Sequence, residues 1–150
     1  MDYDNEIKII MSSKSQNEAF ARIAAAAFAS QADPLVADIT EIKTAVSEAV
    51  TNSIIHGYDG VENGEIILTL KLKDDEFCVE ISDAGRGIEN IEEAMQPMFT
   101  SKPEMERSGM GFTVMETFMD YIKVTSKKDK GTNVIMKKKL SRHAPPSDIF

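Results

Sequence analysis

The sequence predicts an α/β fold: a two-layer sandwich with helices on one face of a mixed, mostly antiparallel sheet. Between Ser15 and Phe28, and again between Asp33 and Gly57, apolar residues recur every three or four positions, which is typical of amphipathic helices. After Gly57 the period changes to two, which is typical of strands with one buried face. The chain has 150 residues, a length that suits one domain with one core.

The first half of the chain is predicted to hold one strand and two helices. Glu6 to Met11 alternates weakly and predicts the strand. The first helix is predicted to begin at a capping box, Ser15-Gln16-Asn17-Glu18. Asp33-Pro34 matches an N-cap followed by a first-turn proline, so the second helix is expected to run from there to Gly57, about 24 residues. Its apolar stripe comprises Ile39, Ile42, Val46, Ala49, Val50 and Ile54, and that of the first helix comprises Phe20, Ile23, Ala24, Ala27 and Phe28.

The second half is predicted to form two hairpins separated by a loop and a helix. The loop covers residues 97–110, which are rich in Pro, Ser, Thr, Lys and Gly, and the helix covers Phe112 to Met119. One domain is therefore expected over residues 1–140, followed by a flexible tail, 141–150. The strands of the hairpins are Ile66–Leu72 with Phe77–Ile81, and Tyr121–Ser126 with Thr132–Leu140.

Composition excludes several classes of function. A net charge of −8 argues against direct nucleic-acid binding, which needs a positive surface. No apolar run approaches the ~20 residues of a membrane helix, and the acidic N-terminus lacks the apolar core of a signal peptide, so a cytoplasmic protein is expected. Cys78 is the single cysteine, so no internal disulfide can form, and its place in a strand pattern predicts a buried, inert thiol. There is no Cys/His cluster for zinc.

Two polar residues of the second helix suggest chemistry. Glu48 and Asn52 are four residues apart, so they share a face, and neither belongs to the apolar stripe. A carboxylate can accept a proton from an attacking hydroxyl, and an asparagine oxygen suits Mg²⁺ beside phosphates. For the pair taken alone, a solvated polar face is the simpler interpretation.

A glycine motif, Asp83-Ala84-Gly85-Arg86-Gly87, directly follows a predicted strand. Glycines permit a close approach that side chains would block, and an aspartate here could accept a hydrogen bond from an exocyclic amine. A tight turn after the strand explains the motif equally well when it is taken alone.

A second glycine pair lies in Ser108-Gly109-Met110-Gly111, at the start of the helix predicted to follow. Amide N–H groups at a helix N-terminus favour anions, although a surface loop with ordinary capping also fits. The phosphate-loop motif G-x-x-x-x-G-K-[ST] and the dinucleotide motif G-x-G-x-x-G are both absent.

The order of these motifs resembles the Bergerat-fold (GHKL) ATP-binding superfamily. Glu48 to Asn52 matches its N box, and Asp83 to Gly87 matches its G1 box. Ser108 to Gly111 matches a shortened G2 box that lacks the extended glycine run, and Gly131-Thr132 matches its late strand threonine. Within the superfamily, residues Ile7 to Leu140 are most similar to the bacterial anti-sigma factor serine kinases.

The resemblance implies roles for the matched residues toward ATP or ADP. Glu48 would be the general base toward a substrate serine, and Asn52 would hold Mg²⁺. Asp83 would bind the adenine amino group, with Thr132 supporting it through water.

The remaining matches would contact the rest of the nucleotide. Gly85 and Gly87 would admit it. Gly109 and Gly111 would cradle its phosphates, and Arg107 would neutralise their charge. The other residues implied to contact the nucleotide are Thr100, Ser101, Lys102, Ser108 and Met110.

The resemblance also implies partners. These are a sporulation sigma factor of the sigma-F type, an anti-anti-sigma factor that is phosphorylated on serine, and a second copy of the chain in a homodimer. Glu18 and Arg22, four residues apart on the first helix, are candidate partner contacts, and an ordinary ion pair explains them equally well. Two other activities remain open: an ATPase in which Glu48 activates water, and a switch that binds nucleotide without transferring phosphate.

Overall fold

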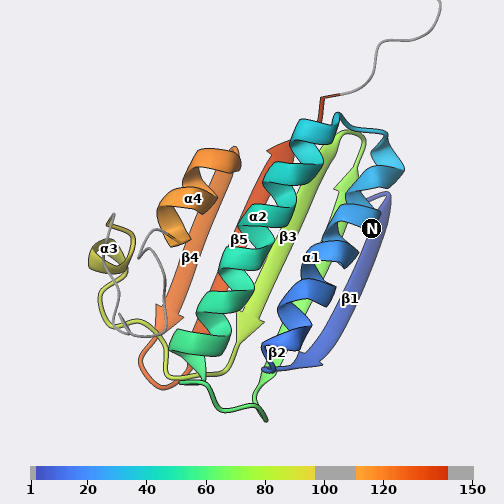
Figure 1. Cartoon of the computed structure of the whole chain (residues 1–150). Coiled ribbons are helices and arrows are strands. Elements are labelled where there is room, and N and C mark those ends of the chain that lie inside the picture. Colours follow the sequence, from blue (N-terminus) through green and yellow to red (C-terminus); the bar gives the residue numbers. More distant parts are fainter. Residues whose placement is uncertain (1–2, 97–110, 142–150) are drawn as a thin grey trace, which may run out of the picture.

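The computed structural model describes residues 3–96 and 111–141, which form a five-stranded sheet with helices along one face (Figure 1). The strands are β1 (Asn5–Ser12), β2 (Glu65–Lys73), β3 (Glu76–Asp83), β4 (Tyr121–Lys127) and β5 (Gly131–Lys139). The helices are α1 (Gln16–Ala29), α2 (Val36–Asn52), α3 (Ile91–Ala94) and α4 (Gly111–Phe118), with a 3₁₀ turn at Ser30–Ala32 and a π-helical turn at Ser53–Gly57.

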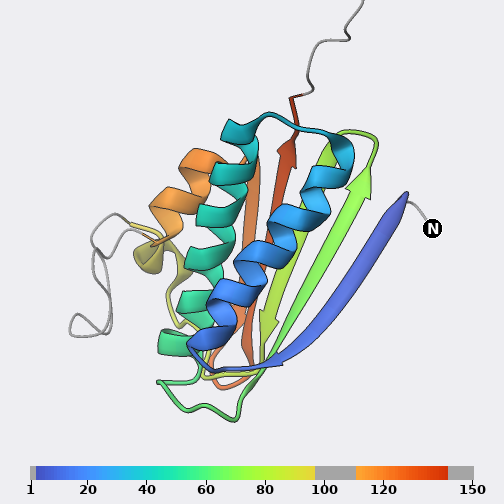
Figure 2. The same cartoon turned by 45° about the vertical axis from the view of Figure 1, so that its right-hand side comes forward.

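The sheet has the strand order β1-β2-β3-β5-β4, and each of these neighbouring pairs is antiparallel. Figures 1 and 2 both show α1, α2 and α4 on the same face. The predicted two-layer sandwich is confirmed, and the described strands contain no parallel pair that would make the sheet mixed.

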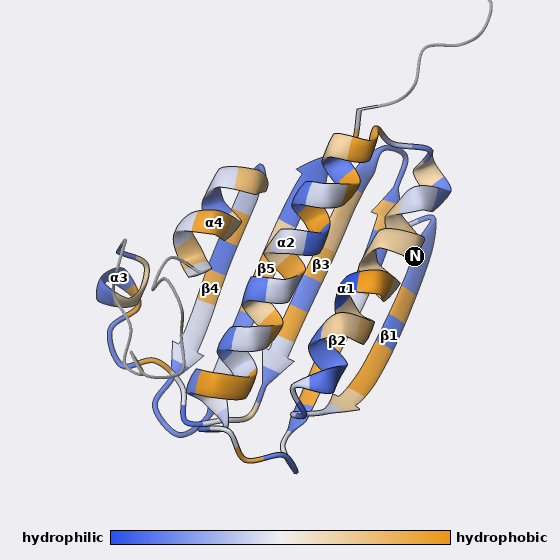
Figure 3. Ribbon diagram, viewed as in Figure 1, coloured by the Kyte–Doolittle hydropathy of each residue, from blue (hydrophilic) through white to orange (hydrophobic). Residues whose placement is uncertain are grey.

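The core lies between α2 and the helix-facing side of the central strands. Ile42, Val46 and Val50 of α2 are fully buried. The alternating residues of the first hairpin face them, and Figure 3 shows these apolar positions along the strands. Each such side chain contributes about 1.5–3 kcal/mol by leaving water. The buried residues of this hairpin that follow the predicted period of two are Ile66, Leu68, Leu70, Leu72, Phe77, Val79 and Ile81.

The face that α1 buries agrees with the prediction only at Phe28. Phe20 and Ile23 are 57% and 60% exposed. Small residues face the core instead, because alanines allow α1 to approach its neighbours closely. The predicted capping box is also wrong, since the Ser15 side chain makes no cap hydrogen bond. The buried residues of α1 are Ala21, Ala25, Phe28 and Ala29.

The second helix begins later than predicted and ends as predicted. Asp33 has φ 51° and ends the 3₁₀ turn rather than capping α2, whose N-cap is Leu35. α2 has 17 residues, and the π-helical turn then carries the chain to Gly57. Together the two segments form the predicted apolar stripe, in which Ile54 is still buried.

The second half agrees closely with the prediction. Both hairpins form within one or two residues of the expected bounds, and so does α4. The short helix α3 was not predicted. The loop predicted over 97–110 and most of the predicted tail lie outside the described residues.

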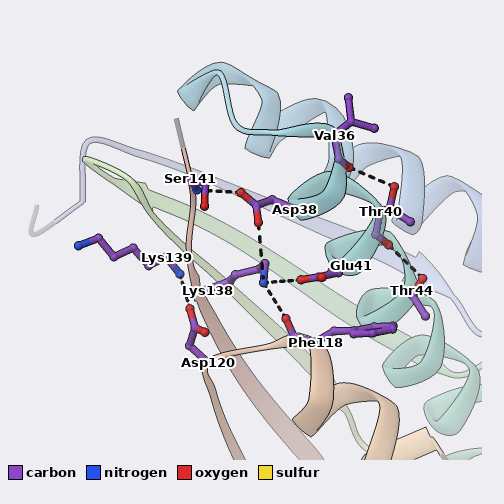
Figure 4. Close-up of polar contacts among 10 residues, drawn as sticks. All are labelled: Val36, Asp38, Thr40, Glu41, Thr44, Phe118, Asp120, Lys138, Lys139 and Ser141. Carbon is purple, nitrogen blue, oxygen red and sulfur yellow. Dashed lines mark hydrogen bonds and ion pairs between the residues drawn. The ribbon is translucent and has the colours of Figure 1, made fainter. Parts of the chain in front are cut away.

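A buried lysine joins three elements at the N-terminal end of α2 (Figure 4). Lys138 Nζ of β5 lies 2.6 Å from Glu41 Oε2 and 4.0 Å from Asp38 Oδ1. It also donates a 2.9 Å hydrogen bond to the carbonyl of Phe118, at the end of α4. Asp38 in turn accepts a 2.7 Å bond from the amide of Ser141. This cluster fixes β5 and α4 against α2.

Two further predictions concern the single cysteine and the absence of a membrane-spanning helix. Cys78 is buried in β3, and this burial raises the pKa of its thiol, as expected for an inert cysteine. Among the described residues, no helix has the length and apolar character needed to cross a membrane.

Candidate functional site

A pocket of about 510 Å³ opens at the C-terminal end of α2. α2 contributes Asn52 to its lining, β3 contributes Asp83, and the glycine loop that follows contributes Gly87. Gly111 at the start of α4 and Thr132 of β5 complete this set. Five of the predicted site residues, distant in sequence, therefore surround one cavity large enough for a nucleotide-sized ligand.

Glu48 and Asn52 lie beside the first residue of α4. A Cβ atom built on Gly111 would lie 3.3 Å from Glu48 Oε2 and 3.2 Å from Asn52 Nδ2. The two side chains therefore share a face, as predicted, and the helix start packs directly against them. A side chain at position 111 would crowd both groups, which explains a glycine there.

Asp83 is held by three hydrogen bonds in a half-buried position. Its Oδ1 accepts from the amides of Gly85 (3.0 Å) and Thr132 (3.2 Å), and its Oδ2 accepts from the Ser53 hydroxyl (2.8 Å). Burial raises the pKa of this carboxyl, and the three donors oppose that rise. All three partners donate and so favour the ionised carboxylate, but burial has the larger effect on its pKa.

The π-helical turn places Ser53 toward Asp83. π-helical turns are rare and often occur at functional sites. Here the turn also brings Gly57 so close that a Cβ would lie 3.1 Å from Asp83 Oδ1. Sequence analysis did not find Ser53, because one serine inside a helical pattern carries no local signal.

Close backbone approaches explain both glycines of the loop after β3. A Cβ on Gly85 would lie 2.2 Å from the carbonyl oxygen of Gly57, which also accepts a 2.9 Å bond from the amide of Arg86. Gly87 has φ 75°, and a Cβ there would lie 2.0 Å from the carbonyl oxygen of Lys127. Gly87 lines the pocket, whereas Gly85 is not among the described residues that line it. The loop is thus fastened to the end of α2 and to the β4–β5 turn.

A row of three polar residues crosses neighbouring strands at the pocket. Thr132 pairs with Asp83 on one side and with Ser126 on the other. The Thr132 and Ser126 hydroxyl oxygens are 2.8 Å apart. The predicted association of Asp83 and Thr132 is therefore present in the structure, and Ser126 extends it.

Other predicted site residues lie elsewhere. Glu18 and Arg22 face each other on α1, with Oε2 and Nε 3.2 Å apart, and do not line the pocket. His56, which was not a predicted site residue, does line the pocket, and its carbonyl accepts a 2.9 Å bond from Arg86 Nε. The remaining predicted nucleotide contacts lie outside the described residues: Thr100, Ser101, Lys102, Arg107, Ser108, Gly109 and Met110.

The residues present fit a magnesium ion only if a ligand supplies most of its oxygen atoms. In the described part of the chain, no group of three or more His, Cys, Asp or Glu could hold a metal ion. Asn52 offers one neutral oxygen, with Glu48 one turn away. Mg²⁺ commonly binds one or two protein oxygens together with phosphates and water, so this donor set suits metal that arrives with a nucleotide.

Comparison with known proteins decides the family. Residues 11–138 match the histidine kinase-like ATPase domain model. An anti-sigma F factor of Clostridium kluyveri is 61% identical over 136 residues, which cover 91% of this chain and 95% of that protein. An anti-sigma F factor of Clostridium botulinum is 58% identical over 139 residues, 93% of this chain and 97% of that protein.

The chain belongs to the anti-sigma F factor family. Its ATPase-type domain implies nucleotide binding.

A solved structure supports the same fold at lower sequence identity. The crystal structure of the RsbU and RsbW domains of a Mycobacterium tuberculosis protein superposes with a TM-score of 0.66 at 20% identity. The match covers 93% of this chain and 33% of the crystallised two-domain chain. The predicted Bergerat-type architecture is thereby confirmed.

Proposed function

We propose that this protein binds and inhibits a sporulation sigma factor of the sigma-F type. We further propose that it is an ATP-dependent serine kinase that phosphorylates and thereby inactivates an anti-anti-sigma factor. The observation that supports this most directly is the pocket in which Asn52, Asp83 and Thr132 meet, with Glu48 beside Gly111. The names of relatives 55–61% identical to this chain, which are anti-sigma F factors, support the sigma-factor partner.

The pocket suggests how ATP or ADP would lie. Asp83 would accept a hydrogen bond from the adenine amine, and Thr132 would add a second contact through water. The phosphates would then extend toward Asn52 and the N-terminus of α4, where amide N–H groups and the helix dipole favour anions. Gly111 begins that helix, so the segment implied to contact the phosphates leads directly into it.

Glu48 is proposed as the general base. The serine Oγ forms a bond to the γ-phosphorus, the bond from that phosphorus to the bridging oxygen of ADP breaks, and the serine proton passes to the Glu48 carboxylate. Mg²⁺, held by Asn52 and phosphate oxygens, would supply charge neutralisation. Such transfer depends mainly on positioning and electrostatics.

Incubation with γ-labelled Mg-ATP and the candidate anti-anti-sigma factor tests the reaction. Label on a serine of the partner is expected, and Glu48→Gln is expected to lower transfer by about 10²–10⁴-fold while ATP still binds. Release of free phosphate alone would identify an ATPase instead. Nucleotide binding with neither product would identify a non-catalytic switch.

We also propose that α1 and the β1 edge contribute to the partner surface and to a homodimer. Phe20 and Ile23 of α1 are 57% and 60% exposed, and β1 is an edge strand of the sheet. Exposed apolar groups on a helix favour a binding surface. Glu18 and Arg22 form a charged pair on the same helix.

Charge reversal tests the partner surface. Arg22→Glu is expected to abolish binding of the sigma factor in a pull-down while ATP binding persists. Lys123→Glu, on β4 at the opposite edge of the sheet, is the matched control and should bind normally. Unchanged sigma-factor affinity in Arg22→Glu would remove Arg22 from the proposal.

A further inference from the structure

Ser126 of β4 is not among the described residues that line the pocket, yet it contacts two residues that do. Its Oγ accepts a 2.7 Å hydrogen bond from the amide of Ile88. It donates a 3.0 Å bond to the carbonyl of Gly131, and it lies 2.8 Å from Thr132 Oγ1. One hydroxyl thus joins the loop after β3 to the start of β5.

The proton count determines the direction of the Ser126–Thr132 bond. A serine hydroxyl has one proton and two acceptor sites. The amide of Ile88 can only donate and the carbonyl of Gly131 can only accept. All three contacts form together only if the Ser126 proton goes to Gly131 and the Thr132 hydroxyl donates to Ser126.

Thr132 therefore presents oxygen lone pairs, and no proton, to the pocket. Asp83 beside it has the same character. Its Oδ1 already accepts from two amides, and its Oδ2 accepts from Ser53, which leaves only acceptor capacity for a ligand. A ligand group that meets this part of the pocket must donate hydrogen bonds, directly or through water.

We propose that Ser126 is a positioning residue that fixes the Thr132 hydroxyl as an acceptor, and that this makes the pocket prefer a base with an exocyclic amine over one with a carbonyl at the same position. The proposal rests on the nucleotide site proposed above. Without Ser126, the Thr132 hydroxyl can turn its proton toward the pocket and donate to a carbonyl edge. The preference for an amine over a carbonyl then falls, although Asp83 still accepts a hydrogen bond from the amine.

Binding of ATP and of inosine triphosphate tests this, because the second carries a carbonyl in place of the 6-amine. Ser126→Ala is expected to lower the ratio of ATP to inosine triphosphate affinity about fivefold to tenfold, the worth of one hydrogen bond. Thr132→Val should lower it similarly. In the Thr132→Val background, Ser126→Ala should change the ratio no further.

Two further variants separate this effect from general damage. Ser126→Cys occupies similar space with a weak acceptor and should lower the ratio in the same direction, which keeps the test valid if Ser126→Ala does not fold. Thr125→Ala, the neighbouring exposed position, is the control and should keep the wild-type ratio.

Three outcomes would overturn the inference. The first is a Ser126→Ala variant whose ratio of ATP to inosine triphosphate affinity equals that of the wild type. The second is a further fall in this ratio when Ser126→Ala is added to Thr132→Val. Wild-type protein that binds neither nucleotide would overturn the proposed ATP site itself, and the inference with it, so the two failures are distinguishable.

Discussion

The Ser53 hydroxyl donates a 2.8 Å hydrogen bond to Asp83 Oδ2 and so joins the end of α2 to the end of β3. The bond depends on the π-helical turn that begins at Ser53. It orients the half-buried carboxylate, whose other oxygen is held by the amides of Gly85 and Thr132. The groups proposed to recognise a base are therefore fixed before any ligand arrives, which reduces the cost of ordering them on binding.

Asp83 is expected to lower stability at neutral pH. Burial raises the pKa of the Asp83 carboxyl in the folded protein. The resulting contribution to folding stability is therefore complete below the ordinary aspartate pKa of about 3.9, and it is lost as the pH rises through the pKa of the folded state. Asp83→Asn should therefore raise the Tm of the ligand-free protein near pH 7 and have a smaller effect near pH 4. Thermal unfolding across this range measures it. Glu92→Gln, exposed on α3, is the control, and a Tm lowered equally at every pH would contradict the prediction.

Gly85→Ala tests the contact between the glycine loop and α2. The added methyl group would lie 2.2 Å from the Gly57 carbonyl oxygen, so either the loop or the helix end must move. We expect the free energy of unfolding to fall by about 1–3 kcal/mol and ATP affinity to fall with it, because Asp83 is held by the same loop. Denaturant unfolding and ATP titration measure the two effects. The neighbouring exposed substitution Ala84→Ser should change neither. Wild-type stability in Gly85→Ala would show that the approach is not as close as described.

Lys138→Met tests the cluster at the other end of α2. Removing the ammonium group leaves Asp38 and Glu41 without their buried partner, so the free energy of unfolding should fall by about 3 kcal/mol. ATP affinity of the folded variant should stay within about twofold of wild type, because the cluster lies at the N-terminal end of α2 and the pocket at its C-terminal end. Lys139→Met, which is exposed, should change stability by less than about 0.5 kcal/mol. Equal effects of the two substitutions would contradict the role of Lys138.

Sequence patterns predicted the parts of the fold that have a clear period. Large apolar residues recur at every second position in the strands between Ile66 and Ile81, and the α2 stripe ends at a glycine, so both were found. The buried face of α1 was predicted only at Phe28, because Ala24 to Ala27 are small and apolar in every direction and the larger Phe20 and Ile23 outweighed them. Asp33 ends the 3₁₀ turn instead of capping α2, with its amide bonded to the carbonyl of Ser30.

The candidate site was predictable where its residues form motifs. Glu48, Asn52 and Asp83 lie in such motifs, and the structure brings them to the same end of α2 and β3. Ser53 and Ser126 were missed because each is a single serine whose importance comes from partners about 30 and about 40 positions away. The sequence predicted the glycine loop. It could not predict the contact between this loop and Gly57, because that contact depends on where the end of α2 lies in space.

Calorimetric titration of Mg-ATP into the wild type and into Asp83→Asn tests the central claim most directly. The account predicts that the wild type binds one ATP per chain and that Asp83→Asn, although folded, binds at least about tenfold more weakly, since a hydrogen bond to a charged group is lost. No binding to the wild type, or equal affinity in the two proteins, would contradict it.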